Sequence, residues 1–203
     1  DIDSVCSAEV DTSDGLIINI GYPKAFDNEY LRPVIRLEIG PLAAMVPSGK
    51  FPVRPYAAEA LPDLFEAPEV LVETIKAERT FWEKATILHA EAHRPKGRAQ
   101  QGRYSRHYYD VYRMLGSEAG INAVGDEKLL SEVVSFKARF YPSGRANYGP
   151  AVKGTLKLVP GGEMLKKLKT DYGQMREMIF GDYPDFDSVI GKLTKFEGDF
   201  NSK

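Results

Sequence analysis

The change of hydrophobic period near residue 77 constrains the fold of this chain more than any other sequence feature. Before it, apolar and polar residues alternate, so that Ile35, Leu37 and Ile39 would share one face of a strand. After it, apolar residues recur at spacings of three and four, the period of a helix. Because strands come first and helices follow, we expect the α+β class, with a small β-sheet followed by a helical C-terminal bundle. We divide the chain into a sheet-containing part, residues 1–76, and a helical part, residues 77–203.

Turn residues and breakers bound the individual elements. The predicted strands are Leu16–Tyr22, Val34–Gly40 and Val70–Ile75, and a short helix with Pro62 in its first turn is expected over Ala60–Phe65. In the second strand, Glu38 points away from the apolar face. Asp126 is a predicted N-cap, and Arg94-Pro95 ends the first long helix. The predicted long helices are the segment from Ala77 to Arg94, Tyr104–Leu115, Glu127–Tyr141, Glu163–Phe180 and Phe186–Phe200.

Composition excludes several classes of protein. The chain of 203 residues has a net charge of −2, so as a whole it is not electrostatically attracted to nucleic acid. No apolar run reaches the ~18 residues of a membrane span and no signal peptide opens the chain, so we expect no membrane partner. The single cysteine, Cys6, cannot form an internal disulfide, so we expect a reducing, cytoplasmic location.

Positive charge is concentrated between Arg94 and Arg113. This stretch contains six Lys or Arg residues, four Tyr residues and a single acidic residue. A basic stretch rich in aromatic residues can hold phosphates and stack bases, as RNA-binding segments do. It can equally be a solvated loop and helix face, and the sequence leaves both interpretations open.

Lys84 occupies an unusual position for a lysine. It lies on the apolar stripe of its helix, between Phe81 and Leu88. A buried ammonium needs an anionic partner, or it must give up its charge. The sequence therefore leaves two interpretations: a structural salt bridge or a snorkelling side chain, or a lysine that holds a phosphate.

A polar cluster opens the next helix. Arg106, His107 and Asp110 lie within one turn of each other, where they can orient a metal, a phosphate or a proton acceptor. They can also be a simple ion pair between Arg106 and Asp110 on a helix surface. Together with Glu38 and Lys84, Asp110 would supply the carboxylates and the cation that Mg²⁺-dependent phosphoryl or nucleotidyl transfer requires. Spacing alone does not show that these residues converge.

Four segments carry a resemblance to a known family. The most specific is Glu78–Leu115, where an R-T-x-x-E-K helix is followed by an R-H-x-x-D helix. The others are Tyr22–Gly40, Arg54–Phe65 and the segment LKLVPGGEMLKKLKTDYGQMREMIFGDYPDFDSVI. In these segments the chain resembles the AbiEii/AbiGii family of nucleotidyltransferase-like toxins, and the resemblance covers nearly the whole chain.

The resemblance implies both a fold and a function. The fold would be a minimal nucleotidyltransferase half, here residues 1–76, followed by a helical half. The activity would be transfer of a nucleotide from an NTP, with Mg²⁺, to an RNA acceptor such as tRNA or to a protein. The protein would act as the toxin of a toxin–antitoxin or phage-defence pair, with a cognate antitoxin as partner. By resemblance, Lys84 and Asp110 are catalytic, Arg79, Arg106 and His107 contact the cofactor phosphates or the acceptor, and Glu38 binds metal.

One part of the family pattern is missing. The Gly-Gly/Ser turn and the Asp-x-Asp strand end, which would hold the triphosphate and two Mg²⁺ ions, have no counterpart ahead of the strands. Asp1-Ile2-Asp3 has matching letters, but nothing precedes it to build the turn, so we interpret it as a chance match. The chain then looks like the C-terminal portion of such a protein. The alternative is that the sequence begins within the motif itself, and the sequence leaves open whether a nucleotide-binding segment precedes it.

Two other functions stay open at this point. The chain would also suit a non-catalytic module that binds an antitoxin or RNA through residues 94–113 and dimerises through its C-terminal helices. A metal-dependent hydrolase would use His89 and His93, which are four residues apart, but the H-E-x-x-H pattern and a nearby cysteine are missing. A P-loop and a Rossmann fingerprint are also missing.

Overall fold

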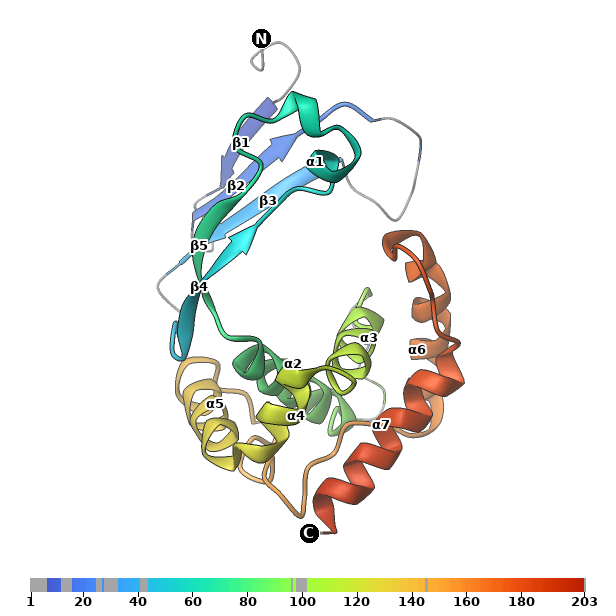
Figure 1. Cartoon of the computed structure of the whole chain (residues 1–203). Coiled ribbons are helices and arrows are strands. Elements are labelled where there is room, and N and C mark those ends of the chain that lie inside the picture. The colour runs from blue at the N-terminus through green and yellow to red at the C-terminus, as the bar shows by residue number, and fades with distance from the viewer. Residues whose placement is uncertain are drawn as a thin grey trace.

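The computed structural model describes residues 7–11, 16–24, 27, 33–40, 44–95, 97, 102–144 and 146–202. Within these residues, two small antiparallel sheets come first along the chain and the long helices follow. Figure 1 shows the strands gathered at one end of the molecule and the long helices at the other. The predicted α+β class is therefore confirmed. The division into two domains at residue 76 stays a prediction.

The first sheet is antiparallel, with the order β1-β2-β3. Its strands are β1 (Ser7–Asp11), β2 (Leu16–Gly21) and β3 (Val34–Ile39). Ile18 lies opposite Leu37 and Ile20 opposite Ile35, so the apolar face predicted for β3 continues onto β2. This face is largely open to solvent, since Ile35 is 53% and Leu37 43% exposed. Strand β1 was not predicted, because only two of its five residues are apolar.

The second sheet is a hairpin of two strands, β4 (Ser48–Val53) and β5 (Val70–Ile75). Strand β5 has the predicted bounds. Pro52 is tolerated inside β4 because β4 pairs with β5 alone within the described residues. The helix predicted over Ala60–Phe65 is wrong in its bounds: helix α1 (Ala57–Ala60) and the 3-10 helix η2 (Pro62–Leu64) flank Leu61. Pro62 disfavours helical backbone at the residue before it, and Leu61 accordingly has φ −135° and ψ 62°.

The remaining elements form the helical part. They are α2 (Ala77–Ala92), α3 (Ser105–Met114), α4 (Glu118–Gly125), α5 (Glu127–Phe140), α6 (Gly162–Gln174), the 3-10 turn η3 (Met175–Met178) and α7 (Phe186–Asn201). Asp126 caps α5 as predicted, because its Oδ1 accepts a hydrogen bond from the backbone N–H of Leu129 at 2.9 Å. Helix α4 was not predicted. The single helix predicted over Glu163–Phe180 ends earlier, at Gln174, where the chain tightens into η3.

Helix α2 forms the centre of the core. Phe81, Trp82, Ala85 and Leu88 are fully buried, and α2 packs against α3, α4 and α5. The indole Nε1 of Trp82 donates to the carbonyl oxygen of Ala123 at 2.9 Å, so its polar atom is satisfied. Burial of one large apolar side chain contributes about 1.5–3 kcal/mol. Stability is therefore concentrated in the helical part and not in the exposed sheets.

Polar side chains from α6 and α7 hold the connecting segments in place. Asp171 of α6 accepts hydrogen bonds from the backbone N–H groups of Arg103 at 2.6 Å and Ser105 at 2.8 Å, which satisfies free donors at the start of α3. Asn201 of α7 bonds both the N–H and the carbonyl of Leu156, at 3.0 and 2.7 Å. These contacts fix the position of α3 and of the extended segment that precedes α6.

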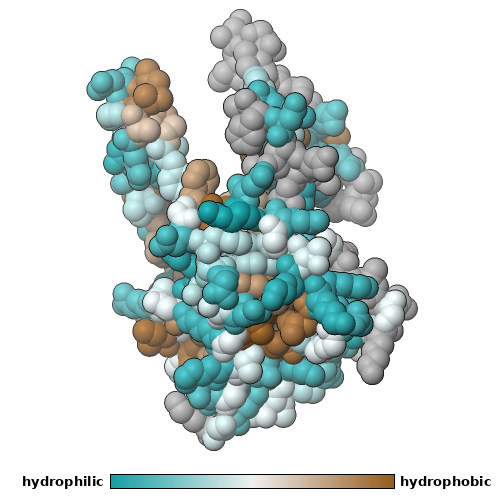
Figure 2. Space-filling view, turned by 90° about the vertical axis from the view of Figure 1, so that its right-hand side faces the viewer, coloured by the Kyte–Doolittle hydropathy of each residue, from teal (hydrophilic) through white to brown (hydrophobic). Residues whose placement is uncertain are grey.

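The surface of the helical part is mixed. Figure 2 views the molecule from the side on which α6 and α7 lie, and hydrophobic residues gather there in separate patches within a mainly hydrophilic surface. Across the described residues, no helix is both long enough and apolar enough to pass through a bilayer.

Candidate functional site

Lys84 of α2 and Asp110 of α3 form an ion pair. The Nζ of Lys84 lies 2.9 Å from Oδ2 of Asp110 and 3.3 Å from Nδ1 of His107, which is also on α3. The side chains of Lys84 and Asp110 are 27% and 36% exposed, so the pair lies at the edge of the core with access to solvent. The structure thus brings three of the predicted site residues together. The unusual position of Lys84 is explained because α2 packs directly on α3.

His107 contributes a neutral imidazole to this cluster. Burial, followed in effect by the neighbouring charges of Lys84, Arg106 and Lys137, lowers the pKa of His107 to about 3. The ring is therefore neutral at neutral pH, and its Nδ1 accepts a hydrogen bond from the Lys84 ammonium. A neutral acceptor at this position orients the ammonium without adding a charge of its own.

Lys137 of α5 is a further member of the site that the sequence analysis missed. Its Nζ donates to the backbone carbonyl oxygen of Glu83 at 2.7 Å. Burial lowers the pKa of Lys137 to about 8, although the nearby carboxylate of Glu83 opposes this effect. A signal for Lys137 was present, since it follows Val133 by four residues and so lies on the apolar stripe of its helix, as Lys84 does on α2.

A pocket of about 550 Å³ opens beside the two lysines, between α2, α5 and the end of β5. Its lining includes Lys84, Lys137, Glu73 and Glu83, together with the rings of Tyr141 and Tyr148. Pockets of this size hold small molecules, and a mixture of aromatic surface with a few converging polar groups is typical of such sites. The pocket therefore has the size and the mixed lining of a small-molecule site.

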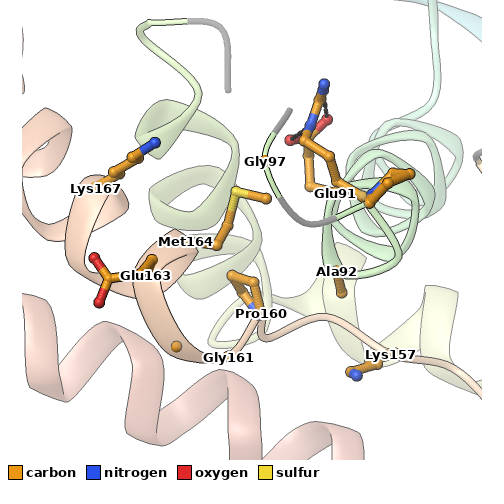
Figure 3. Close-up of a pocket in the computed structure, with 12 residues that line it drawn as sticks. Glu91, Ala92, Gly97, Lys157, Pro160, Gly161, Glu163, Met164 and Lys167 are labelled. Carbon is orange, nitrogen blue, oxygen red and sulfur yellow. Dashed lines mark hydrogen bonds and ion pairs between the residues drawn. The ribbon is translucent and has the colours of Figure 1, made fainter. Parts of the chain in front are cut away.

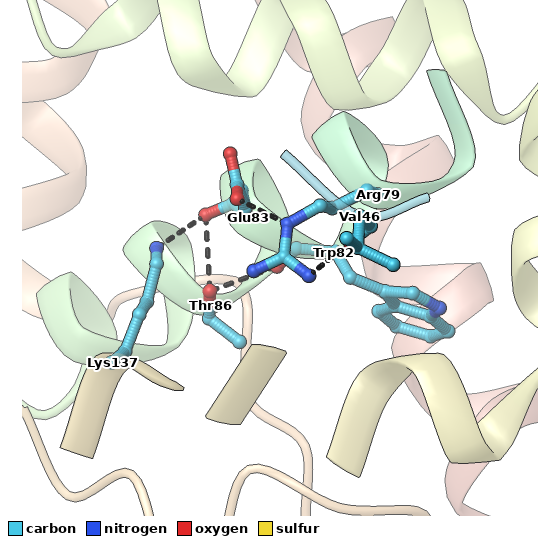
Figure 4. A network of polar contacts seen from close by, with 6 residues as sticks. All are labelled: Val46, Arg79, Trp82, Glu83, Thr86 and Lys137. Carbon is cyan, nitrogen blue, oxygen red and sulfur yellow. Dashed lines mark hydrogen bonds and ion pairs between the residues drawn. The ribbon is translucent and has the colours of Figure 1, made fainter. Parts of the chain in front are cut away.

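Arg79 lies in the polar network shown in Figure 4. Its Nε lies 2.9 Å from Oε1 of Glu83, and its Nη1 donates to the carbonyl oxygen of Val46 at 2.7 Å. Arg79 is only 3% exposed and stacks over Phe136, with its Cζ 5.4 Å from the ring centroid. In this arrangement Arg79 ties the start of α2 to the segment before β4. Its Nη2 is buried without a partner in the described part of the chain.

Two predicted residues lie apart from the Lys84 cluster. Arg106 is exposed at the start of α3 and forms no ion pair within the described residues, because Asp110 pairs with Lys84 instead. Glu38 is exposed on the polar face of the first sheet, where its Oε1 lies 2.8 Å from Nε of Arg36. In the described residues, no polar contact joins Glu38 to Lys84 or Asp110.

One protein family model matches nearly the whole sequence. The family described as "Nucleotidyl transferase AbiEii toxin, Type IV TA system" matches residues 3–192, nearly the whole chain. The chain belongs to this family. Its class is therefore that of a nucleotidyltransferase-type toxin of a type IV toxin–antitoxin system. Neither the curated proteins nor the solved structures contain a match to the chain.

Nucleotidyltransferases of this kind usually act on NTPs with a divalent metal ion. Among the described residues of this AbiEii chain, however, no three His, Cys, Asp or Glu side chains lie together in a way that would hold a metal ion. Asp110 is engaged by Lys84, and Glu38 by Arg36. The described residues alone therefore do not supply a complete set of metal ligands. Asp1 and Asp3 lie outside the described residues.

His89, one of the two histidines suggested for a zinc hydrolase, lies in the core of this AbiEii chain. Nε2 of His89 lies 2.9 Å from the carbonyl oxygen of Asn147, and its Nδ1 accepts a hydrogen bond from the N–H of Lys157 at 3.0 Å. Burial lowers the pKa of His89 to about 4, so the fully buried ring is neutral at neutral pH. Both ring nitrogens are occupied by backbone groups, and His89 has no nitrogen free to bind zinc.

Tyrosines of the basic stretch pack into and against the core. Tyr108 is fully buried, Tyr109 and Tyr112 are partly buried against the core, and Tyr104 is partly buried beside the ring of His107. These rings contribute to the core, which leaves little aromatic surface for stacking bases. Residues 96 and 98–101 of the stretch lie outside the described residues, and its interpretation as an RNA-binding segment stays a prediction.

A second pocket, of about 700 Å³, lies at the start of α6 (Figure 3). Pro160, Gly161 and Met164 line it, with Lys157 and Lys167 at its border. Arg94, which also lines this pocket, forms an ion pair with Glu91. The pocket holds none of the residues that the family resemblance assigns to the site.

Proposed function

We propose that this chain supplies the phosphate-side and acceptor-side residues of an AbiEii nucleotidyltransferase that transfers a nucleotide from an NTP to an RNA or protein acceptor. The observation that carries the proposal is the arrangement of Lys84. Its ammonium is accessible, is oriented by Asp110 and His107, and lies at the edge of a pocket large enough for a nucleotide.

The chemistry assigns a role to each residue. In such a transfer, an oxygen of the acceptor hydroxyl bonds to the α-phosphorus while the bond to pyrophosphate breaks, and the hydroxyl proton passes to a base or to solvent. Lys84 holds a phosphate oxygen and offsets its negative charge. Asp110 and His107 keep the Lys84 ammonium in position. Arg106, exposed at the start of α3, contacts phosphate or acceptor. Glu38 as a metal ligand stays a prediction.

Substitution of the ion pair tests this proposal. In the full-length gene product, Lys84→Ala and Asp110→Asn should reduce the transfer of labelled nucleotide by about 10²–10³-fold, as expected when a preorganised charge at a transferring phosphate is removed. Toxicity on expression should fall with it. The matched control is Lys195→Ala, which breaks an exposed Lys–Asp pair of α7, with Asp199, and should change neither readout. Undiminished transfer and toxicity in Lys84→Ala would show the assignment to be wrong.

Partners and acceptor follow from the same proposal. Membership of a type IV toxin–antitoxin family supports an antitoxin as the functional partner of this protein. The acceptor, whether tRNA, another RNA or a protein, is identified by incubating the full-length protein with labelled NTP and cell extract. The labelled product is then treated with ribonuclease or with protease, and the treatment that removes the label names the class of acceptor.

A further inference from the structure

Lys137 has no carboxylate partner within the part of the chain that the structure describes, although three carboxylates lie close to the pocket. Each of them is engaged by another side chain. These bonds are Arg79–Glu83 at 2.9 Å, Lys84–Asp110 at 2.9 Å and Ser48–Glu73 at 2.7 Å. Two of the three carboxylates are thus paired with cations, Glu73 is bonded to a neutral hydroxyl, and Lys137 is the cation without an ion pair among the described residues.

The environment of Lys137 raises the cost of its charge. Its ammonium carries three donors, and one hydrogen bond, to the carbonyl oxygen of Glu83, is formed within the described residues. The Glu83 carboxylate attracts the ammonium, but that carboxylate is already paired with Arg79, and Lys84 and Arg79 of α2 add repulsion. A partly buried cation without a counter-ion is unfavourable, and an anion placed against it would remove this cost.

We infer that this pocket binds the polyphosphate of a nucleoside triphosphate, with Lys137 as a second phosphate-binding cation beside Lys84. The identity of the ligand rests on the proposed nucleotide transfer. Two ammonium groups carried by different helices can hold neighbouring phosphates, each through charge-assisted hydrogen bonds. The volume of about 550 Å³ suits a ligand of this size, and Tyr141 and Tyr148 offer aromatic surface to the base.

A purely structural role for Lys137 makes different predictions. If the only role of Lys137 were its hydrogen bond to the Glu83 carbonyl, substitution of Lys137 would lower the stability of the protein and leave ligand binding by the folded protein unchanged. Lys137→Met keeps the length and the apolar stem of the side chain while removing its charge and donors. Lys137→Arg keeps the charge and donors. The two substitutions therefore separate packing from anion binding.

The test uses inorganic tripolyphosphate as the probe and the full-length protein. Calorimetric titration should show saturable binding that Lys137→Met and Lys84→Met each weaken at least about tenfold, because each removes a charge-assisted hydrogen bond. Lys137→Arg should retain most of the affinity, and Lys195→Met should bind like the unmodified protein. In parallel, an amine-specific reagent followed by mass spectrometry should label Lys137 at least about tenfold more slowly when tripolyphosphate is present, with Lys195 unaffected.

The outcomes separate this inference from the proposed function. Unchanged tripolyphosphate affinity in a folded Lys137→Met variant would overturn the inference. If Lys137→Met fails to fold, the labelling of the unmodified protein decides, and equal labelling of Lys137 with and without tripolyphosphate overturns it. Transfer that depends on Lys84 but shows no protection of Lys137 leaves the function and removes the inference. Protection of Lys137 in a protein without transfer activity supports the anion site and removes the function.

Discussion

Acid should destabilise this protein through its two buried, neutral histidines. The pKa of His107 in the folded protein is about 3 and that of His89 about 4, against an ordinary value of 6.5 for each. Below pH 6.5 the unfolded chain takes up protons that the folded chain does not, so the free energy of unfolding falls as the pH falls from 6.5 towards these folded values. Above pH 6.5 neither histidine contributes to the pH dependence.

The size of the effect follows from the linkage relation. A pH of 5 lies about 1.5 units below the pKa of each histidine in the unfolded chain, and each unit corresponds to about 1.4 kcal/mol of unfolding free energy. Each residue should therefore cost about 2 kcal/mol at pH 5. Because His107 is 8% exposed and His89 fully buried, solvent screening reduces these figures little. Together they predict a loss of about 4 kcal/mol between pH 7 and pH 5.

Urea unfolding at pH 7, 6 and 5 measures the effect, with the free energy extrapolated to water. The informative variant is His107→Gln, whose side-chain oxygen can still accept the hydrogen bond from Lys84 but does not titrate. It should lose about 2 kcal/mol between pH 7 and pH 5, half the loss of the unmodified protein. All other groups titrate alike in both proteins, so the difference isolates His107. Equal losses in the two proteins would refute the view that His107 is buried in its neutral form.

Two further predictions concern the packing around the site. A Cβ added at Gly120 would lie 1.9 Å from the carbonyl oxygen of Met114. Gly120→Ala should therefore lower the free energy of unfolding, measured in urea, by at least about 2 kcal/mol. The control Gly125→Ala, whose added Cβ would meet nothing within 4 Å, should show no such loss. Asp171→Ala leaves the start of α3 uncapped and should cost about 1–2 kcal/mol; unchanged thermal and urea midpoints would show that water replaces the cap at no cost.

Local sequence signals were enough for much of the helical part. Asp126 was predicted as an N-cap from its position before an apolar run, and the structure confirms it because capping depends on residues three apart. Strand β5 was also predicted with its exact bounds, because its run of strand-favouring residues, VLVETI, is a local signal. Helix α4 was missed because its eight residues are too few to show a helical period, and its glycine close to Met114 reflects contact between helices and not propensity.

The candidate site was predictable only in part, because its contacts join different elements. The sequence singled out Lys84 and Asp110, and the structure places their charged atoms 2.9 Å apart. From the sequence, an ion pair between Arg106 and Asp110 within α3 was an equally good interpretation. In the structure Asp110 pairs with Lys84 instead, because α2 packs on α3. Glu38 and Arg79 were assigned to the site by resemblance. Glu38 contacts Arg36 in the first sheet, and Arg79 contacts Glu83 of α2 and Val46 in the segment before β4.

Lys84 and Lys137 show how a lysine on an apolar stripe can be interpreted before a structure exists. Each breaks the hydrophobic pattern of its helix at a position where burial carries a cost, and a fold keeps such a residue only if something offsets that cost. For Lys84 the offset lies within the chain, in Asp110. For Lys137 the described residues offer one hydrogen bond, to a carbonyl oxygen, and a nearby Glu83 carboxylate that is already paired with Arg79, so the offset within the chain is weaker. Because of this difference, the reactivity of the Lys137 amine should change more than that of the paired Lys84 when an anion enters the pocket.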